Sequence, residues 1–115
     1  MIGQTSFHGL PAVRLAAADG GHAVIMLQGA HLVSWIPAGG TEWLYVSPRS
    51  PFRAGKPIRG GVPLVFPQFA TYGSLPQHGF ARTQPWRVAG EQGGGVIFRL
   101  DSTAGMIRVP RLALA

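Results

Sequence analysis

The sequence predicts an all-β protein, and three features of its composition and pattern support that fold class. Glycine and proline are frequent, with 17 and 10 residues in a chain of 115, as in proteins built from short strands joined by turns. No stretch shows the 3.6-residue apolar periodicity of a long helix. Hydrophobic residues make up 46% of the chain and charged residues 12%, which excludes an intrinsically disordered protein. A chain of this length can bury one modest core, so we predict a single domain over residues 1–115.

The first predicted element is a β-hairpin over residues 12–27. Alternating and β-branched residues flank Asp19-Gly20-Gly21, a sequence typical of a tight turn. Residues 31–36 alternate in character again and predict another strand. After a Pro-Ala-Gly-Gly turn, residues 42–46 predict a short aromatic strand.

The second half of the chain predicts one more hairpin after a long irregular segment. Residues 86–90 and 95–100 pair around Gln92-Gly93-Gly94. Residues 47–85 are predicted to be mostly irregular, with a buried strand at 62–66. The three tryptophans are expected in the core or on a cleft wall, because aromatic residues at alternating strand positions usually pack inside: Trp35, Trp43 and Trp86.

The segment from Gly55 to Trp86 carries the strongest functional signal. It contains several cations, and no Asp or Glu occurs between Trp43 and Gly90 to neutralise them. Irregular loops longer than about 12–15 residues are uncommon in compact domains and are usually functional. The alternative, a set of short strands that the pattern does not reveal, is compatible with a functional loop. The expected ligand is an anion.

Two clusters within this segment have suitable chemistry. Arg59 stands between Pro57 and two glycines, and its planar guanidinium suits phosphate or carboxylate. The second cluster is Gln77-His78-Gly79-Phe80-Ala81-Arg82. In an extended backbone His78, Phe80 and Arg82 would share one face and Gln77 would lie on the other, and a bend at Gly79 would bring Gln77 to them. A solvent-exposed Arg59 and a purely structural His78 are the alternatives.

Other site classes are not expected. The +6 charge is scattered without a basic run or basic helix, which argues against nucleic acid as a partner. No window approaches the ~20 apolar residues of a membrane span, and no secretory signal is evident, so a cytoplasmic location is expected. The chain has no cysteine, and its remaining histidines lack ligand spacing, so neither a metal nor a cofactor is predicted: His8, His22 and His31.

Catalytic residues cannot be assigned from the residues themselves. The chain has only four acidic side chains: Asp19, Glu42, Glu91 and Asp101. Three of the four lie in or beside predicted turns. A general base of carboxylate type is therefore hard to find.

Three motifs together resemble the aldose 1-epimerase superfamily, in its glucose-6-phosphate 1-epimerase (hexose-6-phosphate mutarotase) branch. They are Gly29-Ala30-His31 with Trp35, the run GKPIRGGVPLVFPQF and the segment QHGFAR. The resemblance covers about residues 10–103. It implies the N-terminal portion of an antiparallel β-sandwich, the galactose mutarotase-like supersandwich, and an isomerase that interconverts the α and β anomers of a hexose 6-phosphate or other aldose. It also implies substrate contacts at Arg59, Gln77 and Arg82, with His78 in the sugar site.

The resemblance further implies that the chain lacks catalytic residues. In the family a glutamate and a histidine act as base and acid, and both lie downstream of QHGFAR, beyond this chain. Residues 104–115 depart from the family pattern, and we expect a frameshift or premature stop near residue 104. Three functions follow as hypotheses: a truncated mutarotase that is weak or inactive alone, a non-catalytic phosphosugar-binding module, or a small all-β protein that self-associates through uncovered sheet edges.

Overall fold

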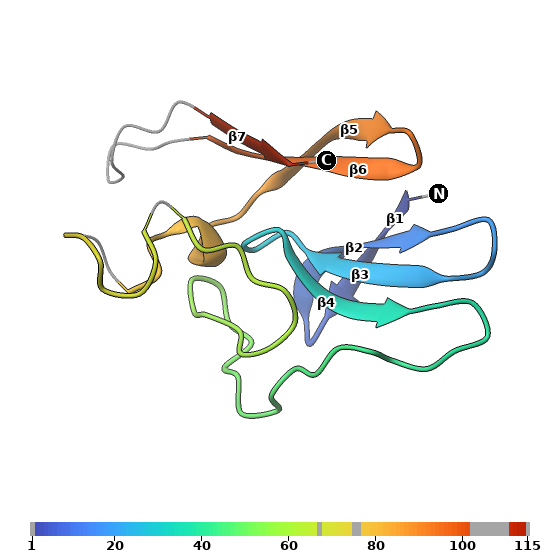
Figure 1. Cartoon of the computed structure of the whole chain (residues 1–115), viewed down its shortest axis with the longest axis horizontal. Helices are drawn as coiled ribbons and strands as arrows, with labels where there is room; N and C mark the ends of the chain where they lie inside the picture. The colour runs from blue at the N-terminus through green and yellow to red at the C-terminus, as the bar shows by residue number, and fades with distance from the viewer. Residues whose placement is uncertain (1, 67, 75–76, 102–110, 115) are drawn as a thin grey trace.

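The computed structural model describes residues 2–66, 68–74, 77–101 and 111–114, and it consists of two antiparallel sheets (Figure 1). The first sheet has the order β1-β2-β3-β4, and the second has the order β5-β6-β7. The strands are β1 (Ile2–Phe7), β2 (Leu10–Ala16), β3 (His22–Met26), β4 (His31–Ile36), β5 (Arg87–Gln92), β6 (Gly95–Asp101) and β7 (Arg111–Leu114). One short 3-10 helix, η1 (Ala81–Thr83), precedes β5. In these residues no helix is long and apolar enough to cross a membrane.

The two predicted hairpins are confirmed. β2 pairs with β3 around a turn in which the carboxylate of Asp19 accepts the amide of Gly21 at 2.8 Å. β5 pairs with β6 around the Gly93-Gly94 turn, where both glycines have positive φ. The predicted strand at residues 31–36 is β4.

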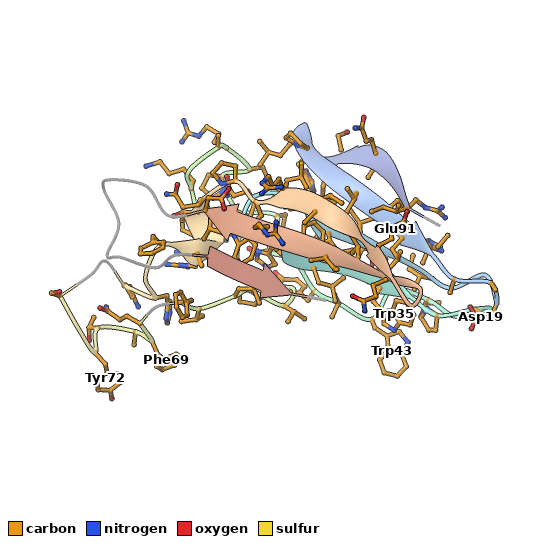
Figure 2. All side chains as sticks on the ribbon, turned by 90° about the horizontal axis from the view of Figure 1, so that it is seen from above. Asp19, Trp35, Trp43, Phe69, Tyr72 and Glu91 are labelled. Carbon is orange, nitrogen blue, oxygen red and sulfur yellow. The ribbon has the colours of Figure 1, made fainter. Side chains whose placement is uncertain are left out.

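The two sheets pack face to face around one core, which confirms the sandwich prediction. Figure 2 shows the sheet of β5–β7 lying across the sheet of β1–β4. Apolar residues from both sheets share one buried cluster, as alternation along each strand requires: Val13, Ala23 and Ile25 from the first, and Val96, Phe98 and Leu100 from the second, with Trp86 at the entrance to β5.

A second, smaller cluster covers the opposite face of the first sheet. Met26 and Val33 are buried there against Ile58, which belongs to the irregular segment after β4. The side chain of Gln28 fastens this segment, because its amide donates to the carbonyl of Lys56 at 2.7 Å and its oxygen accepts the amide of Gly55 at 2.9 Å. The irregular segment is therefore docked on the sheet.

The predicted aromatic strand at residues 42–46 is wrong. This segment forms only an isolated bridge between Val46 and Gly60. The carboxylate of Glu42 accepts the backbone amides of Trp35 and Leu44, so side-chain contacts replace a regular ladder. Trp43 is 74% exposed, contrary to the expected core or cleft-wall position. Trp86, at 3% exposure, is confirmed as a core residue.

The predicted strand at residues 62–66 is also not continuous. Val62 bridges to Leu32 and Phe66 bridges to Gly79, so the two ends of the segment have different partners. Pro63 cannot donate a backbone hydrogen bond to a ladder.

Two strands were not predicted. β1 carries the polar sequence Gly-Gln-Thr-Ser on an outer strand, and β7 pairs with β6. The turn between β1 and β2 places His8 in a ring stack on Phe52 at 3.8 Å between centroids, rather than at a loose terminus. The expectation of a frameshift near residue 104 falls on 102–110, which lie outside the described residues.

Candidate functional site

The three sequence motifs meet at the start of β4. Before this strand, the amide of Gly29 donates to the carbonyl of Gln84 at 2.8 Å, and the amide of Trp86 donates to the carbonyl of Leu27 at 2.7 Å. A Cβ at Gly29, where φ is +75°, would stand 2.6 Å from the backbone oxygen of Arg82. Glycine is required here because the two chain segments touch through their backbones. This contact sets the position of Arg82.

The segment that carries Arg59 is fixed to β4 and to Ser50 by hydrogen bonds from its backbone amides. The amide of Val62 donates to the carbonyl of Leu32 at 2.8 Å, and the amide of Arg59 donates to the hydroxyl of Ser50 at 3.0 Å. Gly60, between them, has a φ of +111°, and a Cβ there would lie 2.2 Å from the carbonyl oxygen of Tyr45. The exposed side chain of Arg59 therefore projects from a constrained backbone.

The side chain of His31 connects β4 to the segment that carries Arg59. Its ring is 1% exposed, and its Nε2 donates to the carbonyl of Gly60 at 2.6 Å. Burial lowers the pKa of His31, the hydrogen bond to Gly60 opposes that shift, and the positive charge of Arg82 adds to the lowering. The ring is consequently neutral near pH 7, with its proton on Nε2.

The QHGFAR segment does not take the extended form that the sequence suggested. His78 and Gly79 have φ values of +63° and +71°, and η1 follows directly. The amides of Phe80 and Ala81 both donate to the carbonyl of Phe66, at 3.0 and 3.1 Å. Phe80 is buried in the core while Arg82 is half-buried, so the expected common face of His78, Phe80 and Arg82 is wrong.

The ring of His78 is oriented by the backbone of Ala70. The amide of Ala70 donates to Nδ1 of His78 at 2.9 Å, and the amide of His78 donates back to the carbonyl of Ala70 at 2.9 Å. Because Nδ1 accepts, the proton of the neutral ring lies on Nε2. Nε2 is therefore a hydrogen-bond donor. The exposed ring of Phe69 packs beside it at 5.3 Å between centroids.

Arg82 and Gln77 lie in the same cluster. Nη2 of Arg82 donates to the backbone carbonyl of Gln77 at 3.3 Å, and the side chain of Gln77 is exposed. Nε of Arg82 is buried without an acceptor among the residues that the structure describes. The guanidinium thus has donor capacity that these residues leave unused. Arg82 thus contacts the backbone of Gln77, the residue before His78, and the turn that carries Arg59 is tied to His31 through the carbonyl of Gly60.

The four carboxylates are engaged elsewhere. Asp19 caps the first hairpin turn, Asp101 pairs with Arg87 at 3.5 Å, and Glu91 is exposed in the last hairpin. The described part of the chain contains no group of three or more His, Asp or Glu side chains that could hold a metal ion.

Glu42 is held at the edge of β4. It accepts hydrogen bonds from the hydroxyl of Ser34 and the amides of Trp35 and Leu44. Desolvation is the largest single effect and opposes ionisation, but these hydrogen bonds together outweigh it and lower the pKa of Glu42. Its oxygens are committed to structure.

The sequence predicts a structural or exposed role for His31 and gives no sign of the hydrogen-bonded pair of Ala70 and His78. Only the Gly29-Ala30-His31 motif pointed to His31. Nothing in the local pattern pointed to the Ala70–His78 pair, because this pair depends on two turns that meet in space.

Comparisons with known proteins agree on one family. The aldose 1-epimerase family model matches residues 11–106. A candidate glucose-6-phosphate 1-epimerase of Escherichia coli (strain K12) is 47% identical over 85 residues, which cover 70% of this chain and 29% of that protein. Its namesake in Salmonella typhimurium is 46% identical over 87 residues, covering 70% and 30%.

Two solved structures resemble the chain closely. The candidate mutarotase YeaD from Salmonella typhimurium superposes with a TM-score of 0.76 at 34% identity, covering 90% of this chain and 37% of that one. HI1317 superposes with a TM-score of 0.75 at 29% identity, covering 98% and 46%. The chain thus spans less than half the length of each of these relatives. From its matching sequence model and its shared fold, the chain belongs to the aldose 1-epimerase family.

Proposed function

We propose that this chain binds a hexose 6-phosphate on the surface formed by Arg59, Gln77, His78 and Arg82, hereafter the binding wall, as the substrate-binding part of a mutarotase-like protein. One observation carries the proposal. Two arginines without neighbouring carboxylates are held by a shared backbone framework around His31, beside a histidine whose donor nitrogen is fixed.

The chemistry of the binding wall suits a phosphosugar. The guanidinium groups of Arg59 and Arg82 offer planar donors for phosphate oxygens. Nε2 of His78 offers a hydrogen bond to a sugar hydroxyl or ring oxygen, and the exposed amide of Gln77 can both donate and accept. The family names of the relatives that the chain matches point to the same substrate class.

The reaction itself, interconversion of the α and β anomers, needs a base at the C1 hydroxyl and an acid at the ring oxygen, on opposite sides of the reacting atoms. All four carboxylates of the chain are structural or remote from the binding wall. We therefore propose that the 115-residue chain binds hexose 6-phosphate but catalyses its anomerisation weakly or not at all by itself.

Calorimetric titration with glucose 6-phosphate tests the binding step. A hydrogen bond to a charged group contributes about 1.5–3 kcal/mol, so Arg82→Ala and Arg59→Ala should each weaken binding by roughly tenfold to a hundredfold. Arg14→Ala is the matched control, because Arg14 is exposed on β2 away from the three motifs; its affinity should equal that of the wild type. Equal affinities for all variants would contradict the proposal. Anomer exchange followed by NMR should show no acceleration over buffer.

A second function is favoured by a groove between the sheets. It has a volume of about 530 Å³ and lies between β1, β2 and the start of β5, with Ile2, Val13, Trp86 and Val88 on its walls. β1 and β5 are outermost strands of their sheets in the part of the chain described. We propose that a second copy of the chain pairs there. Light scattering should show a dimer at high concentration, and Gln4→Pro in β1, where the backbone amide lies on the free edge, should abolish it; a strict monomer at all concentrations would contradict this.

A further inference from the structure

We propose that His31 is a positioning residue for the binding wall: it holds the backbone that carries Arg59 at a fixed place relative to Arg82. The inference rests on the proposed function for its consequence in binding. Its structural basis is independent of any ligand. In this role His31 acts through Gly60 and not by touching the ligand, because its side chain is almost completely buried.

The first link is the hydrogen bond from Nε2 of His31 to the carbonyl of Gly60 at 2.6 Å. Gly60 follows Arg59 directly, and its φ of +111° is open to glycine but strained for other residues. The next residue, Gly61, is packed so tightly that a Cβ there would lie 3.0 Å from Nε2 of His31 and 2.3 Å from the carbonyl oxygen of Leu32. The imidazole therefore sets how closely this turn can approach β4.

The second link runs to Arg82. The positive charge of Arg82 adds to the lowering of the His31 pKa that burial causes. The backbone of Arg82 also contacts Gly29, two residues before His31. A single short segment, Gly29-Ala30-His31, thus touches both arginine-bearing loops. The side chain of His31 hydrogen-bonds to the Arg59 loop, and Gly29 packs against the backbone of the Arg82 loop.

A neutral ring is needed for this arrangement. A protonated His31 would place a second positive charge near Arg82 in a desolvated position, which is costly. The neutral ring with its proton on Nε2 satisfies Gly60 without adding charge beside the binding wall. The hydrogen bond to Gly60 requires a proton on Nε2, and burial, which lowers the pKa of His31, disfavours a second proton on Nδ1.

Three variants separate positioning from simple core packing. His31→Gln keeps an N–H donor at about the place of Nε2, whereas His31→Leu keeps the bulk and removes the donor. Val96→Ala is the control for lost stability, because Val96 is buried on β6 in the core between the sheets, a different cluster from the one that contains Ile58, the residue before Arg59. We expect His31→Leu to bind glucose 6-phosphate about tenfold more weakly, in line with the loss of one hydrogen bond. His31→Gln should stay within about threefold of wild type, and Val96→Ala should bind like wild type despite unfolding at lower urea.

Nitrogen NMR of the ligand-free protein provides a readout that does not depend on binding. The His31 ring should show the Nε2–H tautomer, and the backbone amides of Arg59, Gly60 and Gly61 should shift in His31→Leu but not in Val96→Ala. If wild-type protein fails to bind glucose 6-phosphate while these shifts are seen, the proposed function fails and the positioning role stands. An Nδ1–H tautomer, or unchanged amides at Arg59–Gly61 in folded His31→Leu, would overturn the inference.

Discussion

Gly29→Ala is the substitution whose effect the structure specifies most closely. The new Cβ would lie 2.6 Å from the oxygen, 2.9 Å from the Cα and 3.0 Å from the carbonyl carbon of Arg82. These are backbone atoms, so no side chain can rotate away to relieve the contact. The change therefore has to move one of the two segments that meet at the start of β4.

The magnitude follows from two separate effects. A side chain at positive φ costs about 1–2 kcal/mol, and forced overpacking costs about 1–3 kcal/mol more. Gly29→Ala should thus lower the free energy of unfolding by about 2–5 kcal/mol. Gly9→Ala isolates the first effect, because Gly9 has a similar φ of +83° with no atom within 4 Å of the added Cβ. It should cost only about 1–2 kcal/mol.

Urea unfolding followed by tryptophan fluorescence measures both values, and titration with glucose 6-phosphate measures the displacement of Arg82. Gly29→Ala should bind about tenfold more weakly under conditions where it is folded, and Gly9→Ala should bind like wild type. Equal destabilisation by the two substitutions would refute the claimed backbone contact between Gly29 and Arg82. Unchanged affinity in folded Gly29→Ala would refute its role in placing the arginine.

Three further predictions concern stability. Trp86→Phe should lower the free energy of unfolding by about 1–3 kcal/mol, because the indole Nε1 donates to the buried carbonyl of Ala81 at 2.9 Å; Trp43→Phe, at an exposed position, should change it by less than about 0.5 kcal/mol. Glu42→Gln should lower the urea midpoint at pH 7. Because the folded-state pKa of Glu42 is lowered from 4.5, that difference should persist above about pH 4.5 and vanish as the pH falls through the folded-state pKa; a difference that persists in acid would contradict this. Because the pKa of His31 is lowered from 6.5, His31 binds a proton at a higher pH in the unfolded chain than in the folded protein. Stability should therefore fall as the pH drops below about 6.5, by at most ~1.4 kcal/mol per pH unit, and His31→Gln should remove this component in pH-dependent urea titrations.

The elements that the sequence predicted well are those whose signals are local. The β2–β3 hairpin has alternating strands and an Asp-Gly-Gly turn, so its pairing follows from adjacent residues. The β5–β6 hairpin has the same advantage. β1 escaped prediction because Gln4, Thr5 and Ser6 are polar and exposed on an outer strand, which leaves no hydrophobic alternation to detect.

The candidate site was predictable only in part, for a related reason. The family resemblance pointed to Arg59, Gln77, His78 and Arg82 together, whereas local geometry misplaced the QHGFAR segment. Its actual shape depends on consecutive positive φ values at His78 and Gly79 and on hydrogen bonds to Phe66 and Ala70. Such contacts between distant segments have no periodic signature in the sequence. The exposed position of Trp43 has the same origin, since it follows from how Glu42 binds backbone amides at the edge of β4.

Binding of a phosphosugar to the binding wall can be followed residue by residue when nitrogen-labelled protein is titrated with glucose 6-phosphate. We expect saturable shifts at the amides of Gly60, Ala70 and His78 and at the Nε of Arg82, with smaller shifts when unphosphorylated glucose is used. Shifts confined to the groove between β1 and β5, or none at millimolar ligand, would contradict it.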